Sequence, residues 1–267
     1  MHEKKMNDTC KELRKSVLDM MHYSKSSHIG SCFSIIEILY TLYFEILNTR
    51  PANLNDPNRD IFILSKAHAS AALYATLAFK GFFPRGWLKR YYIDDGILPG
   101  HLDRDAVPGV ECSCGSLGHG LPIGLGMAIA KKTKNASGKV FVLLGDGECN
   151  EGSVWEAVMF ASTRKIDNLV AIIDFNHLQG MGADVIDQAN LSERFSAFGW
   201  HTEVVDGHSI EALSGALLSG SPGKPLVIIA NTVKGKGISF MEGKLEWHYK
   251  SPNDQEYEQA LRELEKS

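Results

Sequence analysis

An aspartate between two glycines, Asp146, and an asparagine thirty positions later, Asn176, are the residues of this chain best suited to form one chemical site. A carboxylate and an amide oxygen suit a hard divalent cation, which takes few protein ligands and completes its shell with phosphate and water. Gly145 and Gly147 carry no Cβ, so main-chain N–H groups at this turn can approach phosphate oxygens closely. The pattern predicts a site for a diphosphate bridged to the protein by a metal ion.

Both polar residues follow a short apolar run that is typical of a buried strand. The two runs are Lys139–Leu144 and Leu169–Asp174, and both are rich in β-branched side chains. Parallel strands end at one edge of a sheet, where α/β proteins bind their ligands, so we expect Asp146 and Asn176 to lie close together. A Gly-Asp-Gly turn alone is common in proteins. The prediction of a site therefore depends on Asn176, which follows the turn at this spacing.

Strand-like and helix-like segments alternate along the whole chain. Further strands are expected at residues 60–64, 202–205 and 225–230. Helices are expected to begin at Ser153, where Glu156 would complete a capping box, and to span residues 7–26, 34–47, 65–80, 118–132 and 210–218. The alternation predicts an α/β fold, a three-layer sandwich with a mainly parallel central sheet, formed by residues 1–267 as a single domain.

The composition is that of an ordinary globular protein. Of the 267 residues, 44% are hydrophobic and 22% are charged, and the net charge is −4, so no nucleic-acid partner is expected. Apolar stretches are too short to span a bilayer and the start lacks the core of a signal peptide, so we expect no membrane and a cytoplasmic location. The five cysteines are odd in number and lack metal-ligand spacing, which favours reduced thiols.

Five of the ten histidines, each within two residues of glycine, alanine or tryptophan, are candidates for a site: His28, His68, His101, His119 and His248. Imidazole has a pKa near neutral pH, and it can move a proton or donate a hydrogen bond to phosphate. Four others are expected to be incidental: His2, His22, His201 and His208.

Several motifs resemble those of one enzyme family. The Gly-Asp-Gly turn followed by Asn176 resembles the thiamin diphosphate fingerprint, and EGSVWEA after it resembles the form found in transketolases. Similar matches recur at Ser27–Gly30, Ser65–Ser70, Pro99–His101, Gly109–Ala130, Thr232–Gly237 and Trp247–His248. The chain thus resembles the N-terminal half of a transketolase along nearly its whole length, and the resemblance implies a thiamin diphosphate-binding fold. Four positions depart from the usual family residues: Ala67, Cys114, His177 and Tyr249.

The resemblance implies a role for each candidate residue. The metal, Mg²⁺ or alternatively Ca²⁺ or Mn²⁺, would be held by Asp146, Asn176 and the main-chain carbonyl of Leu178. His28 and His101 would face the sugar and assist proton transfers, and the other catalytic residues would be His248 and Glu151, the latter at the interface between active sites. Thiamin diphosphate would be bound by His68, Gly115, Ser116, Leu117, Gly145, Asp146, Gly147, Glu148, Asn176 and His248.

A complete transketolase is more than twice as long as this chain, and no segment resembles its pyrimidine-binding or C-terminal domain. The glutamate that activates the cofactor belongs to the pyrimidine-binding domain and would lie on a second polypeptide. The resemblance therefore implies the diphosphate-binding subunit of a split transketolase, in a heterotetramer with two copies of each chain. Such an enzyme transfers a two-carbon ketol unit from a ketose or ketose phosphate to an aldose acceptor.

Two other classes stay open from the residues alone. The chain could be half of another thiamin diphosphate enzyme, similar to a deoxyxylulose phosphate synthase or to the E1 component of a 2-oxo acid dehydrogenase. It could instead be a paralogue that binds the cofactor without catalysis. A dinucleotide-binding oxidoreductase is disfavoured, because no G-x-G-x-x-G opens a helix after a strand.

Overall fold

The structure, a computed structural model, describes residues 2–182, 185–220 and 222–266. Its centre is a five-stranded sheet whose neighbours are all parallel, in the order β1-β2-β3-β5-β4. The strands are β1 (Ile61–Leu64), β2 (Val140–Gly145), β3 (Leu169–Phe175), β4 (His201–Asp206) and β5 (Leu226–Asn231). The five strands predicted from the sequence are thereby confirmed to within one residue at each end.

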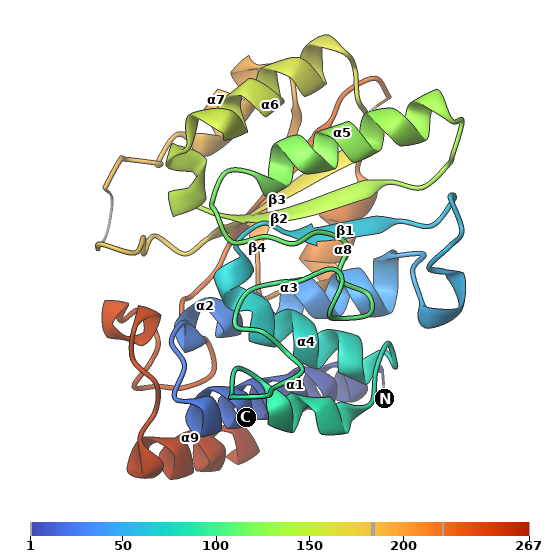
Figure 1. The fold of residues 1–267 in the computed structure, drawn as a ribbon. Coiled ribbons are helices and arrows are strands. Elements are labelled where there is room, and N and C mark those ends of the chain that lie inside the picture. Colours follow the sequence, from blue (N-terminus) through green and yellow to red (C-terminus); the bar gives the residue numbers. More distant parts are fainter. Residues whose placement is uncertain (1, 183–184, 221, 267) are drawn as a thin grey trace.

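Helices cover both faces of the sheet, as Figure 1 shows. One face carries α5 (Gly120–Thr133), α6 (Gly152–Thr163) and α7 (Leu191–Ala197). The other carries α1 (His2–Ser24), α2 (Ile29–Phe33), α3 (Ile36–Tyr40), α4 (Ser70–Phe79) and α8 (Ile210–Leu218), and α9 (Asp254–Lys266) packs against α1. The predicted α/β sandwich of three layers is confirmed.

Side chains along each strand alternate between two hydrophobic clusters, one on each face. Ile63 and Val142 join the cluster under α5 and α6, together with Leu125 and Val158. Their neighbour Leu64 points the other way, into the larger cluster. Because both faces are buried there, β2, β3 and β5 consist almost entirely of apolar residues, as is usual for parallel sheets. The edge strand β4 is partly exposed and carries polar residues.

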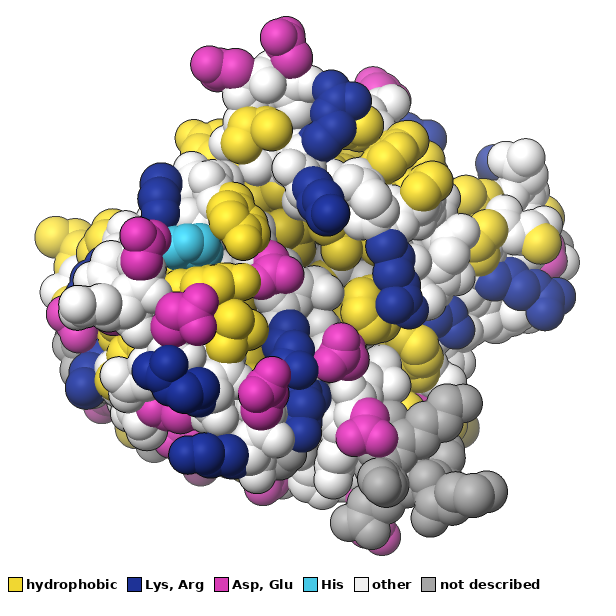
Figure 2. Space-filling view, turned by 90° about the horizontal axis from the view of Figure 1, so that it is seen from below, with side chains coloured by type: hydrophobic (Ala, Val, Ile, Leu, Met, Phe, Trp, Pro, Cys, Tyr) yellow, Lys and Arg dark blue, Asp and Glu magenta, His cyan; other side chains and the backbone are white. Residues whose placement is uncertain are grey.

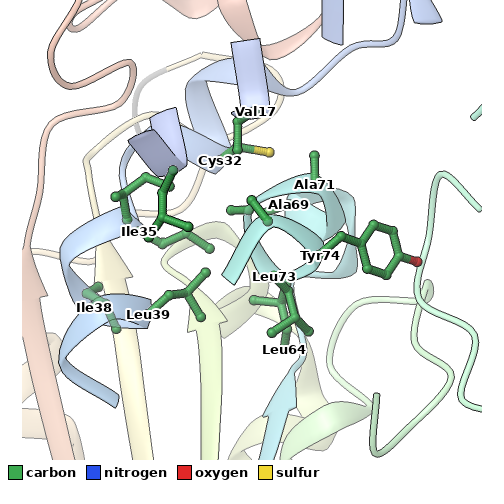
Figure 3. Close-up of a cluster of buried hydrophobic side chains, with 14 of the residues drawn as sticks. Val17, Cys32, Ile35, Ile38, Leu39, Leu64, Ala69, Ala71, Leu73 and Tyr74 are labelled. Atoms are coloured by element: carbon green, nitrogen blue, oxygen red, sulfur yellow. The ribbon is translucent and has the colours of Figure 1, made fainter. Parts of the chain in front are cut away.

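Figure 3 shows part of the larger cluster. Leu73 of α4 lies beside Leu64 at the end of β1, and Val17 of α1 and Leu39 of α3 belong to the same cluster. These helices therefore fix the position of the turn that follows β1, which contributes to the site described below.

Two predicted helices are interrupted, and one predicted cap is wrong. Residues 34–47 form α3 and then a π-helical turn, η1 (Thr41–Ile46), whereas residues 65–80 begin with a 3₁₀ turn, η3 (Ala67–Ala69), before α4. Ser153 does not cap α6, which begins one residue earlier with Glu151 at the N-cap. Its hydroxyl instead donates to the carbonyl of Gly118 at 2.8 Å, so the serine joins α6 to the loop before α5. The other short helices are η2 (Pro51–Asn53), η4 (Arg85–Arg90), η5 (Gly147–Asn150) and η6 (Leu245–His248).

The surface below the sheet, seen in Figure 2, mixes charges of both signs with hydrophobic side chains. Within the described residues, no helix has the length and apolar character needed to cross a membrane. The five cysteines are free thiols, three of them buried.

We expect Gly124→Ala to destabilise the protein, because α5 packs directly on β2 at this glycine. A Cβ at position 124 would lie 2.6 Å from Val142 Cγ2, and relieving that overlap costs about 1–3 kcal/mol. Gly126 provides a matched control on the same helix: no atom lies within 4 Å of its Cβ position, so Gly126→Ala should stabilise by about 0.5–1 kcal/mol. Urea unfolding measures both changes, and equal free energies for the two variants would contradict this packing.

Candidate active site

A cavity of about 480 Å³ opens at the carboxyl edge of the sheet. Four turns that follow strands contribute to its wall: Lys66 follows β1, Asp146 follows β2, Asn176 follows β3 and Lys234 follows β5. This edge is where open α/β sheets bind ligands, and the volume is that of a small-molecule site. The expected proximity of Asp146 and Asn176 is therefore observed.

All the predicted site residues except Ser116 and His101 line this cavity. Ser116 is exposed and lies between two lining residues, whereas His101 lies beside the histidines that line it. His119 is exposed at the N-cap of α5, outside the lining. The predicted residues in the lining are His28, His68, Gly115, Leu117, Gly145, Asp146, Gly147, Glu148, Glu151, Asn176, Leu178 and His248.

Asp146 is fixed by two main-chain N–H groups. Its carboxylate accepts one hydrogen bond from Gly147 at 2.7 Å and another from His177 at 2.8 Å. Burial, together with the neighbouring carboxylate of Asp174, raises the pKa of Asp146 above its usual value. A bound cation would favour the charged form and reverse that shift.

The three predicted ligand oxygens fit a hard cation. Asn176 Oδ1 accepts one hydrogen bond, from the N–H of Leu178 at 3.1 Å, and the carbonyl of Leu178 accepts one from Lys234 Nζ at 3.0 Å. Each of these oxygens, like those of Asp146, has two lone pairs and so keeps one for a metal ion. The described residues contain no group of three or more His, Cys, Asp or Glu arranged for a metal. The Asn176 amide oxygen and the Leu178 carbonyl oxygen would therefore have to complete the ligand set of Asp146.

Glu148 joins three loops beneath the cavity. Its buried carboxylate accepts hydrogen bonds from the Ser65 hydroxyl, from the N–H of Gly118 at 2.8 Å and from the N–H of Gly145 at 3.2 Å. Burial nevertheless raises its pKa. These bonds hold the turns after β1 and β2 against the loop that leads into α5.

Four histidine rings from separate segments meet at the cavity. The ring centre of His28 lies 5.1 Å from that of His68, 5.0 Å from that of His248 and 6.5 Å from that of His101. The N–H of His28 also donates to the carbonyl of His248 at 3.0 Å. His28 has a φ of 81°, a left-handed conformation that costs a non-glycine residue energy and is found at functional sites.

Burial keeps the rings of His28, His68 and His248 neutral. It lowers the pKa of His28 to about 4, with help from His101 and Lys234, and it lowers the pKa of His68 well below the usual value. Burial and the nearby Lys234 lower the pKa of His248 to about 3. Lys234 Nζ lies 2.8 Å from His248 Nδ1, and an ammonium can only donate, so the ring proton of His248 is on Nε2. His248 thus presents an Nε2–H donor.

Stability should fall as the pH is lowered through the range of these histidines. Unfolded histidines take up protons below about 6.5, whereas folded His28 stays neutral to about 4 and His248 to about 3. The unfolded state therefore binds more protons in that interval, and the free energy of unfolding decreases as the pH falls. Chemical denaturation across pH 4 to 7 measures the slope, which His28→Asn should reduce. An unchanged slope would mean that the ring titrates normally.

Several residues of the lining carry no clear signal in the sequence. Lys66 stands inside the Ser65–Ser70 motif, and Lys234 inside Thr232–Gly237, so the motifs mark their segments but not their contacts. Asn150 and Gln179 come together through a 2.9 Å hydrogen bond between side chains from different loops, which no spacing indicates. The remaining unpredicted residues are Ser31, Gly180, Met181 and Val185.

The fold and this cavity define an α/β domain with a ligand site at the carboxyl edge of its parallel sheet, and comparison with known proteins identifies its family. Residues 5–265 match the family described as "Transketolase, thiamine diphosphate binding domain". The chain belongs to the transketolase family.

Two relatives match along almost their entire length, and both are named as subunits. An apulose-4-phosphate transketolase subunit from Actinobacillus succinogenes is 45% identical over 94% of this chain and 92% of its own. A 6-deoxy-6-sulfo-D-fructose transketolase subunit from a Clostridium species is 38% identical over 95% of this chain and 94% of its own. The crystal structure of transketolase from Campylobacter jejuni superposes with a TM-score of 0.91 at 30% identity, covering 97% of this chain but 42% of that one.

These matches confirm two predictions. The chain is a thiamin diphosphate-binding transketolase of the transferase class, and it corresponds to the N-terminal, diphosphate-binding subunit of a transketolase divided between two chains. It spans less than half the length of the single-chain transketolases that it resembles.

Proposed function

We propose that this chain binds the diphosphate of thiamin diphosphate and a divalent cation, and that it transfers a two-carbon ketol unit when joined to a second subunit. The observation that carries the proposal is the meeting of the Gly-Asp-Gly turn, Asn176 and three neutral histidines in one cavity. Bound thiamin diphosphate supplies the electron sink for breaking a carbon–carbon bond, and the protein supplies position and proton transfer.

The cation is held by Asp146, Asn176 and the carbonyl of Leu178, and we propose Mg²⁺, with Ca²⁺ or Mn²⁺ able to replace it. The free lone pair on each oxygen supports this assignment. The main-chain N–H of Gly115, with side-chain donors from His68 and the Nε2–H of His248, is suited to phosphate oxygens. Gly147, whose N–H donates to Asp146, lies beside them in the cavity wall.

His28 and His101 bind the sugar hydroxyls and move protons as the carbon–carbon bond breaks and forms. The lowered pKa of His28 keeps its ring neutral, so that it can both donate and accept hydrogen bonds with sugar hydroxyls. Glu151 is exposed at the cavity, where its carboxylate can reach a neighbouring chain. Leu117, Gly145 and Glu148 shape the wall around the cofactor, and Ser116 lies next to that wall in the sequence, between Gly115 and Leu117.

The substrates are a ketose donor and an aldose acceptor. Two of the relatives matched over almost their full length carry the name of a sugar with an anionic group, a phosphate or a sulfonate, which supports a phosphorylated or similarly charged ketose as the donor. The cytoplasmic location expected from the sequence stays a prediction.

A second polypeptide provides the pyrimidine-binding and C-terminal domains, and residues 1–267 provide one diphosphate-binding domain. A relative matched over 92% of its own length is named as one subunit of a transketolase, which supports a partner chain. We propose two copies of each chain, so that each active site forms between subunits.

Calorimetry of thiamin diphosphate and Mg²⁺ binding, with and without the proposed partner subunit, tests the proposal. We expect tight binding only for the combined subunits, because a site between chains is incomplete in either one alone. Equal, tight binding to the isolated chain would contradict a shared site. A panel of ketose phosphates assayed with the reconstituted pair then identifies the donor, and the absence of two-carbon transfer from every ketose would overturn the proposed activity.

A further inference from the structure

Asp174 lies at the centre of a buried polar cluster beneath the cavity. It stands near the end of the central strand β3, where it pairs with Gly145 of β2 and Ala230 of β5, and it is fully buried. A charged carboxylate in such a place requires compensating partners.

Four donors from different segments surround this carboxylate. Lys66 Nζ forms an ion pair with Oδ2, which also accepts from the Ser34 hydroxyl at 2.7 Å and from Asn176 Nδ2 at 3.0 Å. The Thr232 hydroxyl donates to Oδ1. Burial opposes the charge, but Lys66 and the hydroxyl donors hold the pKa of Asp174 below its usual value.

Asp174 is therefore not available as a metal ligand. Three of the donors occupy Oδ2, and Oδ1 accepts from Thr232. Asp174 is fully buried and is not among the residues that line the cavity, so a cation bound in the cavity would not reach its carboxylate.

The same carboxylate decides which way the Asn176 amide faces. A carboxylate only accepts hydrogen bonds, so the NH₂ group must point to Asp174, and Oδ1 must then point to the other side. On that side Oδ1 accepts from the N–H of Leu178 at 3.1 Å. A flipped amide would set oxygen against the carboxylate and NH₂ against an N–H, which loses both hydrogen bonds.

We infer that Asp174 is a positioning residue for the metal, which fixes Asn176 with its oxygen, rather than its NH₂ group, presented to the cation. This inference rests on the proposed metal and thiamin diphosphate site. Without Asp174, only the N–H of Leu178 still opposes a flip that would turn the NH₂ group, which cannot coordinate a cation, toward the metal. The expected loss in metal affinity is about 10- to 100-fold, as for other outer-shell partners of metal ligands.

The test starts from a protein in which the buried Lys66 ammonium has been removed by Lys66→Met, and it compares two further substitutions of Asp174 in that protein. Lys66→Met keeps the Asp174 oxygen that accepts from Asn176 Nδ2 and removes a neighbouring positive charge, so Mn²⁺ affinity should be retained or increased. Adding Asp174→Leu to Lys66→Met removes the acceptor and should weaken Mn²⁺ binding about 10- to 100-fold. Adding Asp174→Asn instead keeps a carbonyl acceptor for the Asn176 amide and should restore most of the affinity. Thermal unfolding of each variant shows that it is folded.

Mn²⁺ binding is measured by electron paramagnetic resonance of the free ion, with the chain combined with its partner and thiamin diphosphate. Weak binding for Asp174→Leu and near-parental binding for Asp174→Asn, both in the Lys66→Met protein, support the inference. Equal affinity for these two variants overturns it and leaves the proposed function intact. If the unmodified complex shows no Mn²⁺ binding that depends on thiamin diphosphate, the proposed function fails first.

Discussion

Asp146→Ala should abolish metal-dependent binding of thiamin diphosphate. The substitution removes a proposed metal ligand and also the acceptor for the N–H groups of Gly147 and His177, which shape the turn. Loss of an outer-shell partner alone weakens metal binding by about 10- to 100-fold, so loss of a direct ligand should cost at least about 100-fold. In free energy that is at least about 2.7 kcal/mol. Calorimetry on the two-subunit complex, with Mg²⁺ present, measures the change.

Asp94→Ala is a suitable control, since Asp94 is an exposed aspartate away from the lining of the cavity. It should leave cofactor affinity at the level of the unmodified protein. Unchanged affinity for Asp146→Ala as well would remove the Gly-Asp-Gly turn from the metal site.

His101→Ala should slow two-carbon transfer strongly while leaving cofactor binding nearly intact. The His101 ring lies beside His28 and outside the lining near the diphosphate turn, which suits a residue that faces the sugar. A positioned proton-transfer group contributes about 10²- to 10⁴-fold in rate, so a fall in kcat of that order is expected. Steady-state kinetics on a ketose phosphate, with calorimetry of the cofactor, separates the two effects.

His201→Ala serves as the matched histidine control, because His201 lies at the start of β4, whose residues do not line the cavity. Its kinetics should equal those of the unmodified enzyme. If His101→Ala turns over at the same rate as this control, the assignment of His101 to the reaction is wrong.

The strands can be predicted almost to the residue because a parallel sheet buried on both faces needs continuous apolar runs, such as Lys139–Leu144 and Leu169–Asp174. Helix ends are harder to predict. Ser153 has the pattern of a cap, but its hydroxyl donates to the carbonyl of Gly118, an acceptor that local sequence cannot reveal. Tertiary contacts thus override a local preference at this position.

Some residues of the site can be predicted from the sequence, and others cannot. Asp146 and Asn176 are predictable because each follows a strand, and parallel strands bring their ends together. Asp174 is the last residue of an apolar run, and nothing in that run indicates a buried carboxylate with four donors. Lys66 and Lys234 acquire their partners from segments more than fifty residues away. Such contacts exist only in the folded protein.

The main-chain bond between the His28 N–H and the His248 carbonyl has a consequence for synthesis of the protein. Its two residues are 220 positions apart, so a nascent chain cannot complete the histidine cluster until almost all of it has left the ribosome. Contacts of such long range also form late in folding, after local helices and strands. Truncated or partly folded chains are therefore expected not to capture thiamin diphosphate, which leaves the cofactor free for finished subunits.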